Sequence, residues 1–467
     1  MNMRYLFFVI LILILDKTVY PQAKGYDITY TLHGIKDTMA WLCQVYGNEV
    51  YAIDSCKISN ETARFEQTNE DIPHGVYKIL FNDTLFTDII FTGEKVTLES
   101  RIPDIIGSMK VRESEENTLL FGYWQYYFRL QDTLDEVIRR GRELYYASQG
   151  KPSKALDELE KRADQLEKQK IDYIIRMKYD HPGKFAPQLI WSFQKPDYRF
   201  YLINGGSPYP SERDYYQNHF FDRLDFSDPR MLYTEVLFVM INDYMKTFAP
   251  QPSTQVYIEL TEEVLKRAQQ NDEVYQYCIE LFIRNFEVGV WEKVFVHVVE
   301  NHYLRAPLSN PALKNAYASR VQAIRNTSIG EKVPEVCGTT PAGEMKCLSN
   351  EMGTRTLLLI WSFGCDHCES ILPGLVNIQN EYKEKGFRIF AFTLSDNRDS
   401  LQAAIDRYGI NWITVSDYKE FLSEVVDQFN VTVTPVMYLL DADGIITDKP
   451  TTIPVLYSNL VIRYRDQ

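Results

Sequence analysis

Residues 356–368 (TLLLIWSFGCDHC) decide the fold of the C-terminal part of this chain. The run 356–363 is apolar almost throughout, as expected of a strand that is buried on both faces of a sheet. Directly after it, Cys365 and Cys368 enclose two residues. From Ile371 onward, apolar residues recur every three to four positions, which indicates an amphipathic helix. The stretch therefore predicts a buried strand, a loop with a C-x-x-C pair and a helix.

Strands and helices continue to alternate downstream. Further strands are expected at residues 388–394, 412–415, 435–440 and 445–447, and helices at 371–382, 401–408 and 418–429. Gly386 and Gly409 stand where helix C-caps belong. The residues at 441–444 (DADG) predict a hairpin turn between the last two strands. This order implies right-handed βαβ units under a sheet that ends in an antiparallel hairpin.

The C-x-x-C pair has a specific chemical use at this position. Two intervening residues let the sulfurs meet across one helical turn as a reducible disulfide. Cys365 is expected at the helix N-terminus, where free N–H groups and the helix dipole stabilise a thiolate, the nucleophile in disulfide exchange. Cys368, a turn further on, would resolve the mixed disulfide. A protonated His367 would favour the thiolate and Asp366 would oppose it, so both are predicted to tune the redox chemistry.

Three other interpretations of the pair are weaker. A zinc site would need Cys337 and Cys347, whose ten-residue spacing is wrong for a zinc knuckle, so no metal is expected. A purely structural disulfide across two residues would close a small, strained ring. A peroxidase needs no C-x-x-C, and its typical Thr-x-x-Cys is absent because Ser362 stands three residues before Cys365.

Length and composition set the frame for the rest of the chain. At roughly 150 residues per domain, the 467 residues suggest about three domains. Hydrophobic residues make up 45% and charged residues 24%, which is ordinary for a globular protein and excludes wholesale disorder. The net charge of −14 argues against a nucleic-acid partner, which would need clustered Lys and Arg.

The N-terminus predicts export. Residues 6–15 (LFFVILILIL) form an apolar run preceded by Arg4 and ended by Asp16. A ten-residue helix reaches about 15 Å, roughly half of a bilayer core, so we expect a signal peptide over residues 1–23, cleaved near Ala23. A buried N-terminal helix is the alternative. The prediction is an exported protein with no stable membrane span after cleavage.

The remaining residues divide into two regions by their patterns. Residues 24–110 carry short β-like runs between turn signals and predict an all-β sandwich or barrel. Residues 111–328 follow a helical period, interrupted by a loop-rich stretch at 191–228. Neither region carries a catalytic motif.

The chain has seven cysteines, and an oxidising compartment permits disulfides. Cys43 with Cys56, and Cys337 with Cys347, could each bridge neighbouring strands. Buried free thiols fit these four equally well, because spacing does not determine connectivity.

Residues 329–449 resemble the thioredoxin fold, specifically its periplasmic TlpA/ResA-like branch. Pro373 stands five residues after Cys368, and Thr434 and Pro435 precede the hairpin strand. The helix expected at 400–408 is similar to the insertion of that branch. The resemblance implies an α/β thioredoxin-like domain over 329–467 and a thiol–disulfide oxidoreductase without an organic cofactor. It implies protein thiols and disulfides as substrates and a thiol electron donor in the envelope.

The resemblance also implies that Pro435 is cis and faces the dithiol, while the backbone of Thr434 pairs with substrate. Only the resemblance supports the cis bond, because X–Pro bonds in folded proteins are cis in only ~5–6% of cases. Two positions depart from the pattern. Leu359 stands where thioredoxins carry a buried acid, and Gly364 replaces the usual tryptophan. His367 resembles the corresponding residue of oxidising and isomerising relatives, which leaves the direction of electron flow open.

The β region also resembles, more weakly, a domain of unknown function found ahead of thioredoxin domains in exported proteins of Gram-negative bacteria, and the helical middle resembles the spacer of those proteins. Two hypotheses follow. In the first, the protein is an exported thiol–disulfide oxidoreductase in which Cys365 attacks and Cys368 resolves. In the second, it is a cell-envelope binding or scaffold protein whose thioredoxin-like domain is not catalytic.

Overall fold

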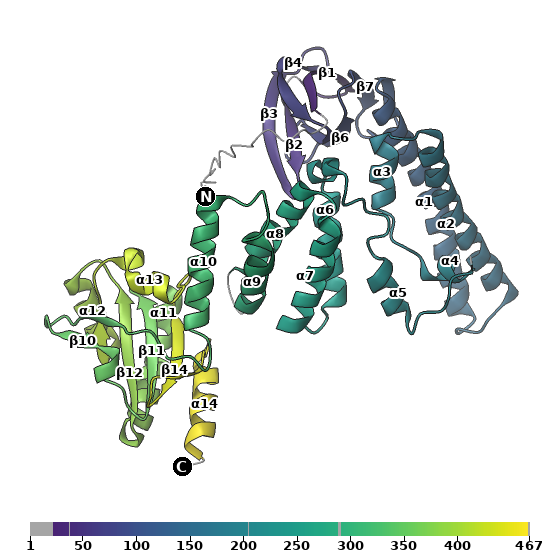
Figure 1. The fold of residues 1–467 in the computed structure, drawn as a ribbon. Coiled ribbons are helices and arrows are strands. Elements are labelled where there is room, and N and C mark those ends of the chain that lie inside the picture. Colours follow the sequence, from purple (N-terminus) through teal and green to yellow (C-terminus); the bar gives the residue numbers. More distant parts are fainter. Residues whose placement is uncertain (1–21, 37, 204, 288–290, 466–467) are drawn as a thin grey trace. The chain divides into compact units, whose positions relative to one another are not determined.

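The computed structural model describes residues 22–36, 38–203, 205–287 and 291–465. The chain divides into two compact units, Met1–Cys278 and Ile279–Gln467, coloured from purple to teal and from green to yellow in Figure 1. Most of the predicted signal peptide, residues 1–21, lies outside the described residues. Across the part of the chain that is described, we find no helix both long and apolar enough to cross a bilayer.

The first unit begins with strands that form two sheets around one apolar core. Among the described residues, one sheet has the order β4-β1-β7-β8 and the other the order β3-β2-β5-β6. Buried side chains of both sheets, such as Tyr30, Phe65 and Tyr77, belong to a single cluster. The strands are β1 (Gln22–His33), β2 (Met39–Tyr46), β3 (Glu49–Lys57), β4 (Thr62–Pro73), β5 (Gly75–Leu80), β6 (Phe86–Phe91), β7 (Val96–Arg101) and β8 (Lys110–Glu113).

Helices make up the rest of the first unit. Two long ones, α1 (Glu115–Ala147) and α2 (Lys154–Asp180), lie side by side. Ser114 and Ser153 cap them by accepting the N–H groups of Asn117 and Leu156, as helix N-termini favour. The helices that follow are α3 (Phe185–Ser192), α4 (Tyr198–Ile203), α5 (Glu212–His219), η1 (Pro229–Tyr233), α6 (Val236–Phe248), α7 (Thr254–Ala268) and α8 (Asp272–Phe286), which contains the division.

The second unit is built on a mixed sheet with the order β13-β12-β11-β14-β15. Strand β11 (Arg355–Ser362) is parallel to β12 (Phe387–Leu394) and antiparallel to β14 (Val436–Asp441), which pairs with β15 (Ile446–Asp448). Short β13 (Ile413–Val415) completes the parallel side. Side chains of β11 alternate between two apolar clusters, one on each face, which explains why its sequence is apolar without alternation.

Helices and a small hairpin complete this unit. On one face of the sheet, α11 (Asp366–Tyr382), α12 (Arg398–Tyr408) and α14 (Ile453–Arg465) contribute to one cluster, while α13 (Glu424–Gln428) contributes to the other. The chain enters through α9 (Glu292–Val298), the π-helical η2 (Val299–Tyr303) and α10 (Pro311–Asn326), then β9 (Cys337–Thr339), β10 (Met345–Cys347) and η3 (Leu348–Asn350). Short 3-10 turns η4 (Lys383–Lys385) and η5 (Glu420–Leu422) lie between larger elements.

The expected elements of this unit are confirmed apart from one helix. Gly386 and Gly409 end their helices in left-handed conformation, as predicted. The expected helix over 418–429 is wrong, because Tyr418 and Glu420 adopt positive φ angles of 59° and 50° that a right-handed helix does not contain. The segment instead forms η5 and α13. The sequence analysis did not predict α14.

The cysteine pairs have different outcomes. Cys337 and Cys347 lie directly opposite each other on β9 and β10 and form a disulfide. Cys43 and Cys56 are free thiols, so of the two alternatives left open for this pair, the bridge does not form. The register explains this, because Cys56 pairs with Ala40 and Cys43 pairs with Ala52, at different levels of the ladder.

Candidate active site

The C-x-x-C pair lies where β11 passes into α11. Gly364 turns the chain with a φ of 78°, a left-handed conformation that glycine adopts without strain. Cys365 is the N-cap of α11, and its Sγ accepts the N–H of Cys368 at 3.3 Å. Its side chain is half-buried, whereas Cys368 is fully buried. The sequence prediction of a cysteine at the helix start, with a second a turn deeper, agrees with this geometry.

The two sulfurs form a close dithiol. Both cysteines are free, and the Sγ atoms are 2.7 Å apart with the Cys368 thiol donating to Cys365. In this arrangement one sulfur accepts hydrogen bonds and the other donates, so the two thiols are chemically unlike.

The pKa values of the pair move in opposite directions. Burial on its own would disfavour a Cys365 thiolate, but hydrogen bonds from the Cys368 thiol, the Cys368 N–H and the Thr434 hydroxyl outweigh it and lower the pKa of Cys365. Burial, followed by the hydrogen bond to Cys365, raises the pKa of Cys368 to about 11. A thiolate therefore forms first on the more accessible sulfur.

Thr434 and Pro435 lie beside this thiolate position. The Thr434–Pro435 peptide is cis, as the resemblance implied. The carbonyl oxygen and the hydroxyl of Thr434 both lie 3.8 Å from Cys365 Sγ. The register of the sheet explains the approach, because Val436 pairs with Ile360 and so brings the residues before β14 to the end of β11.

Asp366 and His367 both lie in the first turn of α11 with exposed side chains. Within residues 291–465, no hydrogen bond joins either side chain to a sulfur. The contribution of His367 comes from its backbone N–H, which favours the Cys365 thiolate. The predicted tuning by these two side chains stays a prediction.

Sequence reasoning missed one acidic residue at this site. Leu359 is fully buried in the apolar cluster, so the position of the usual acid carries none. Glu369, directly after Cys368, instead accepts the Gly364 N–H at 2.9 Å and the hydroxyl of Tyr408. The only sequence signal was an acid in the first turn of a helix, which is common there for electrostatic reasons.

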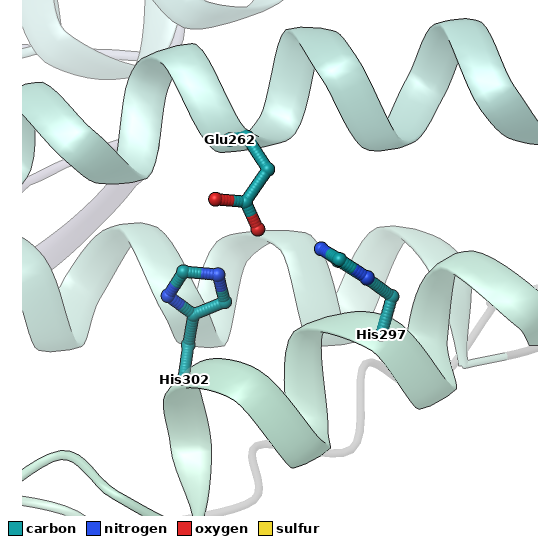
Figure 2. A group of neighbouring side chains, drawn as sticks. All are labelled: Glu262, His297 and His302. Carbon is teal, nitrogen blue, oxygen red and sulfur yellow. The ribbon is translucent and has the colours of Figure 1, made fainter.

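A histidine pair lies elsewhere in this unit. His302 in the π-helical η2 lies five residues after His297 in α9. Figure 2 shows both side chains projecting from the same stretch of helix. Their ring centroids are 6.2 Å apart, and the Asn301 amide donates to the His297 carbonyl. Glu262, which is also drawn there, lies on α7 in the first unit. The sequence analysis did not single out these residues, because a five-residue spacing shares a face only in a π turn.

The central strand, the dithiol at the start of α11 and the cis proline beside it define a thioredoxin-like domain. Residues 329–449 match the AhpC/TSA family model. The chain thus carries a thioredoxin-like domain of the AhpC/TSA family over about a quarter of its length.

Two curated relatives match the same region. Thiol-disulfide oxidoreductase ResA of Geobacillus kaustophilus is 26% identical over 117 residues, which are 25% of this chain and 66% of the relative. Thioredoxin-like protein YneN of Bacillus subtilis is 27% identical over 121 residues, which are 26% of this chain and 69% of the relative. The chain spans about two thirds of the length of these relatives.

Solved structures give corresponding matches. A thioredoxin-like protein from Bacteroides caccae has a TM-score of 0.45 and 18% identity, covering 55% of this chain and 97% of that one. The thioredoxin domain of a thiol-disulfide oxidoreductase from Bacteroides vulgatus has a TM-score of 0.28 and 26% identity, covering 29% of this chain and 97% of that one.

Proposed function

We propose that this protein is an exported thiol–disulfide oxidoreductase that exchanges disulfides with protein substrates through Cys365 and Cys368. The observation that carries the proposal is the asymmetry of the dithiol. Cys365 is half-exposed with a lowered pKa, while the fully buried Cys368 donates its proton toward it. A purely structural pair needs no such difference, so the oxidoreductase is favoured over the scaffold hypothesis.

The reaction follows from the two unlike thiols. The Cys365 thiolate attacks one sulfur of a substrate disulfide, and the second substrate sulfur leaves as a thiolate and takes up a proton. Cys368 then loses its proton and attacks Cys365 Sγ, which breaks the mixed disulfide and frees the first substrate sulfur as a thiol. The substrate gains two electrons and two protons, and Cys365–Cys368 becomes a disulfide. A thiol donor in the envelope restores the dithiol by the same steps in reverse.

Thr434 and Pro435 shape the substrate contact in this proposal. An extended substrate chain would pair with the backbone of Thr434, whose carbonyl lies 3.8 Å from Cys365 Sγ. Phe363, which is 37% exposed, and Val433, which is 57% exposed, immediately precede Gly364 and Thr434. These apolar side chains would pack against the residues that flank a client disulfide. Asp366 and His367 would modulate the potential from the exposed side of the first turn.

The other regions extend the proposal. We infer a signal peptide over 1–23, a β-sandwich domain over 24–110, a helical domain over 111–328 and the thioredoxin-like domain over 329–467. The single core shared by two sheets supports the sandwich. Location in the periplasm or cell envelope rests on the apolar run at 6–15 and on the resemblance to the exported branch. The first two domains would bind the client or a partner.

A trapping experiment tests the function. Cys368→Ser in the full mature chain leaves Cys365 to attack but removes the resolving thiol, so mixed disulfides with envelope proteins should accumulate and disappear on reduction. Cys365→Ser is the matched control and should trap none. The proposal fails if neither variant traps a partner and the wild-type dithiol does not reduce an exposed protein disulfide.

A further inference from the structure

Glu369 connects three parts of the active-site region. Its carboxylate accepts the Gly364 N–H at 2.9 Å and the Tyr408 hydroxyl, and its own N–H donates to the Cys365 carbonyl at 2.9 Å. Gly364 and Cys365 are the two residues that turn the chain from β11 into α11. Tyr408 is the last residue of α12, the helix inserted after β12. One side chain thus ties the turn before the nucleophile to a separate helix.

We propose that Glu369 is a positioning residue for the dithiol and that Tyr408 holds its carboxylate in place. The inference rests on the proposed function, because it assigns a role to residues that surround the same thiols. Within residues 291–465, no hydrogen bond joins Glu369 to a sulfur. Its effect must pass through the Gly364–Cys365 backbone, whose orientation sets where Cys365 Sγ lies relative to the Cys368 N–H and to Thr434.

The charge of Glu369 makes these contacts stronger than neutral ones. The hydrogen bond from Tyr408, and then the one from Gly364, lower the pKa of this carboxyl, so it is ionised at neutral pH. An ionised carboxylate accepts on both oxygens, and such charge-assisted hydrogen bonds are stronger than neutral ones. The same contact with Glu369 raises the pKa of Tyr408, which keeps its hydroxyl proton available to donate.

The inferred role also gives α12 a function. Its last turn carries Tyr408 and then ends at Gly409, which adopts the left-handed conformation with a φ of 64°. Leu401 and Ala404 are fully buried, and Ala404 belongs to the apolar cluster that includes Cys368 and Leu372 of α11. The packing of α12 therefore determines where the Tyr408 hydroxyl lies, and through Glu369 it supports the turn that presents Cys365.

The test is the pH profile of Cys365 alkylation by iodoacetamide in the full chain. Tyr408→Phe removes one hydrogen bond to Glu369, and Glu369→Ala removes both the Gly364 and the Tyr408 contacts. Tyr408→Phe keeps the Glu369 charge and should move the profile to higher pH, lowering the alkylation rate at pH 7 by about threefold to tenfold, the factor that one lost hydrogen bond carries in an equilibrium constant. Glu369→Ala also removes a negative charge, which on its own would favour the thiolate, so its rate is compared with that of Glu369→Gln, which removes the same charge, and it should be lower than in that variant. Glu369→Gln keeps an acceptor for Gly364 and should restore most of the wild-type rate.

The chain offers a matched control on the same helix. Tyr457 donates its hydroxyl to Glu381 near the other end of α11, so Tyr457→Phe removes the same kind of contact away from the thiols. Its alkylation profile should equal that of the wild type, and circular dichroism should show all variants folded. Equal profiles for Tyr408→Phe, Glu369→Ala and Tyr457→Phe would overturn the inference. Alkylation needs no client, so this outcome is distinct from a failure of disulfide exchange.

Discussion

Removing the thiol of Cys368 tests how the fold makes Cys365 reactive. The Cys368 thiol is the strongest of the groups that lower the pKa of Cys365, and it lies 2.7 Å from the accepting sulfur. Cys368→Ala removes this donor and retains the backbone N–H at 3.3 Å. A hydrogen bond to a charged group contributes about 1.5–3 kcal/mol, which corresponds to about one to two pKa units at 1.36 kcal/mol each. The pKa of Cys365 should therefore rise by about one unit.

The assay is the rate of Cys365 alkylation between pH 5 and 10, with reaction at other cysteines followed by mass spectrometry of peptides. At pH 7 the thiolate fraction, and with it the rate, should fall about tenfold in Cys368→Ala, because one pKa unit is tenfold. Cys368→Ser keeps an O–H donor and should lie between the alanine variant and the wild type. Cys56→Ser on β3 is a control that should leave the profile unchanged. An unchanged or lowered pKa in Cys368→Ala would refute the account of the dithiol given above.

Three further predictions address the surroundings of the dithiol. Thr434→Val removes the hydroxyl that lies 3.8 Å from Cys365 Sγ, and it should raise the pKa of Cys365 by less than Cys368→Ala does. The same alkylation profile measures this shift. A larger shift than that of Cys368→Ala would contradict the order in which these hydrogen bonds lower the pKa of Cys365. Leu359→Ala empties a fully buried position between the sheet and α11, so it should lower the free energy of unfolding by about 2–5 kcal/mol, measured by urea denaturation. A loss below about 1 kcal/mol would argue against close packing at this position. Replacing both Cys337 and Cys347 by Ser removes the disulfide that closes a loop with a sequence separation of 10, and it should lower the free energy of unfolding by about 2–3 kcal/mol. The alkylation profile of Cys365 should stay unchanged. A shifted profile would contradict the independence of the two cysteine pairs.

The sequence predicted strand β11 and helix α11 of the second unit well because their patterns depend on neighbouring residues in the sequence. The unbroken apolar run of β11 and the stripe of α11 are each determined by burial on the faces of one element, and the cysteines follow directly between them. The cis bond at Pro435 is different, because an X–Pro sequence does not by itself predict cis and only the family resemblance did. The expected helix at 418–429 failed because its apolar residues do not share one buried face: Leu422 is 89% exposed, whereas Val425 and Phe429 are buried.

Glu369 shows what the sequence could not predict. It lies 39 positions from Tyr408, and the contact depends on how α12 packs on α11 rather than on any local pattern. Strand β4 of the first unit, which the sequence analysis did not single out, is a related case. β4 pairs with β1 along a sheet edge and carries many polar residues on its exposed side, so its sequence lacks the apolar density that marked β11. In both cases long-range packing decided the structure.

The fold makes two chemically identical residues unequal, and this inequality sets the order of the chemical steps. The N-terminus of α11 supplies an N–H to Cys365, and the cis-proline loop supplies a hydroxyl, so that sulfur gains acceptor contacts where a client can reach it. One turn deeper, Cys368 is removed from water among Leu359, Leu372 and their neighbours, and this burial raises the pKa of its thiol, which favours the protonated form. In the proposed mechanism the same order would hold whether electrons flow to or from the client, because both directions would pass through a mixed disulfide on Cys365. The direction of electron flow would then depend on the relative stability of the dithiol and the disulfide. The contacts that stabilise the Cys365 thiolate, including the turn that we propose Glu369 to hold, would act on that balance most directly.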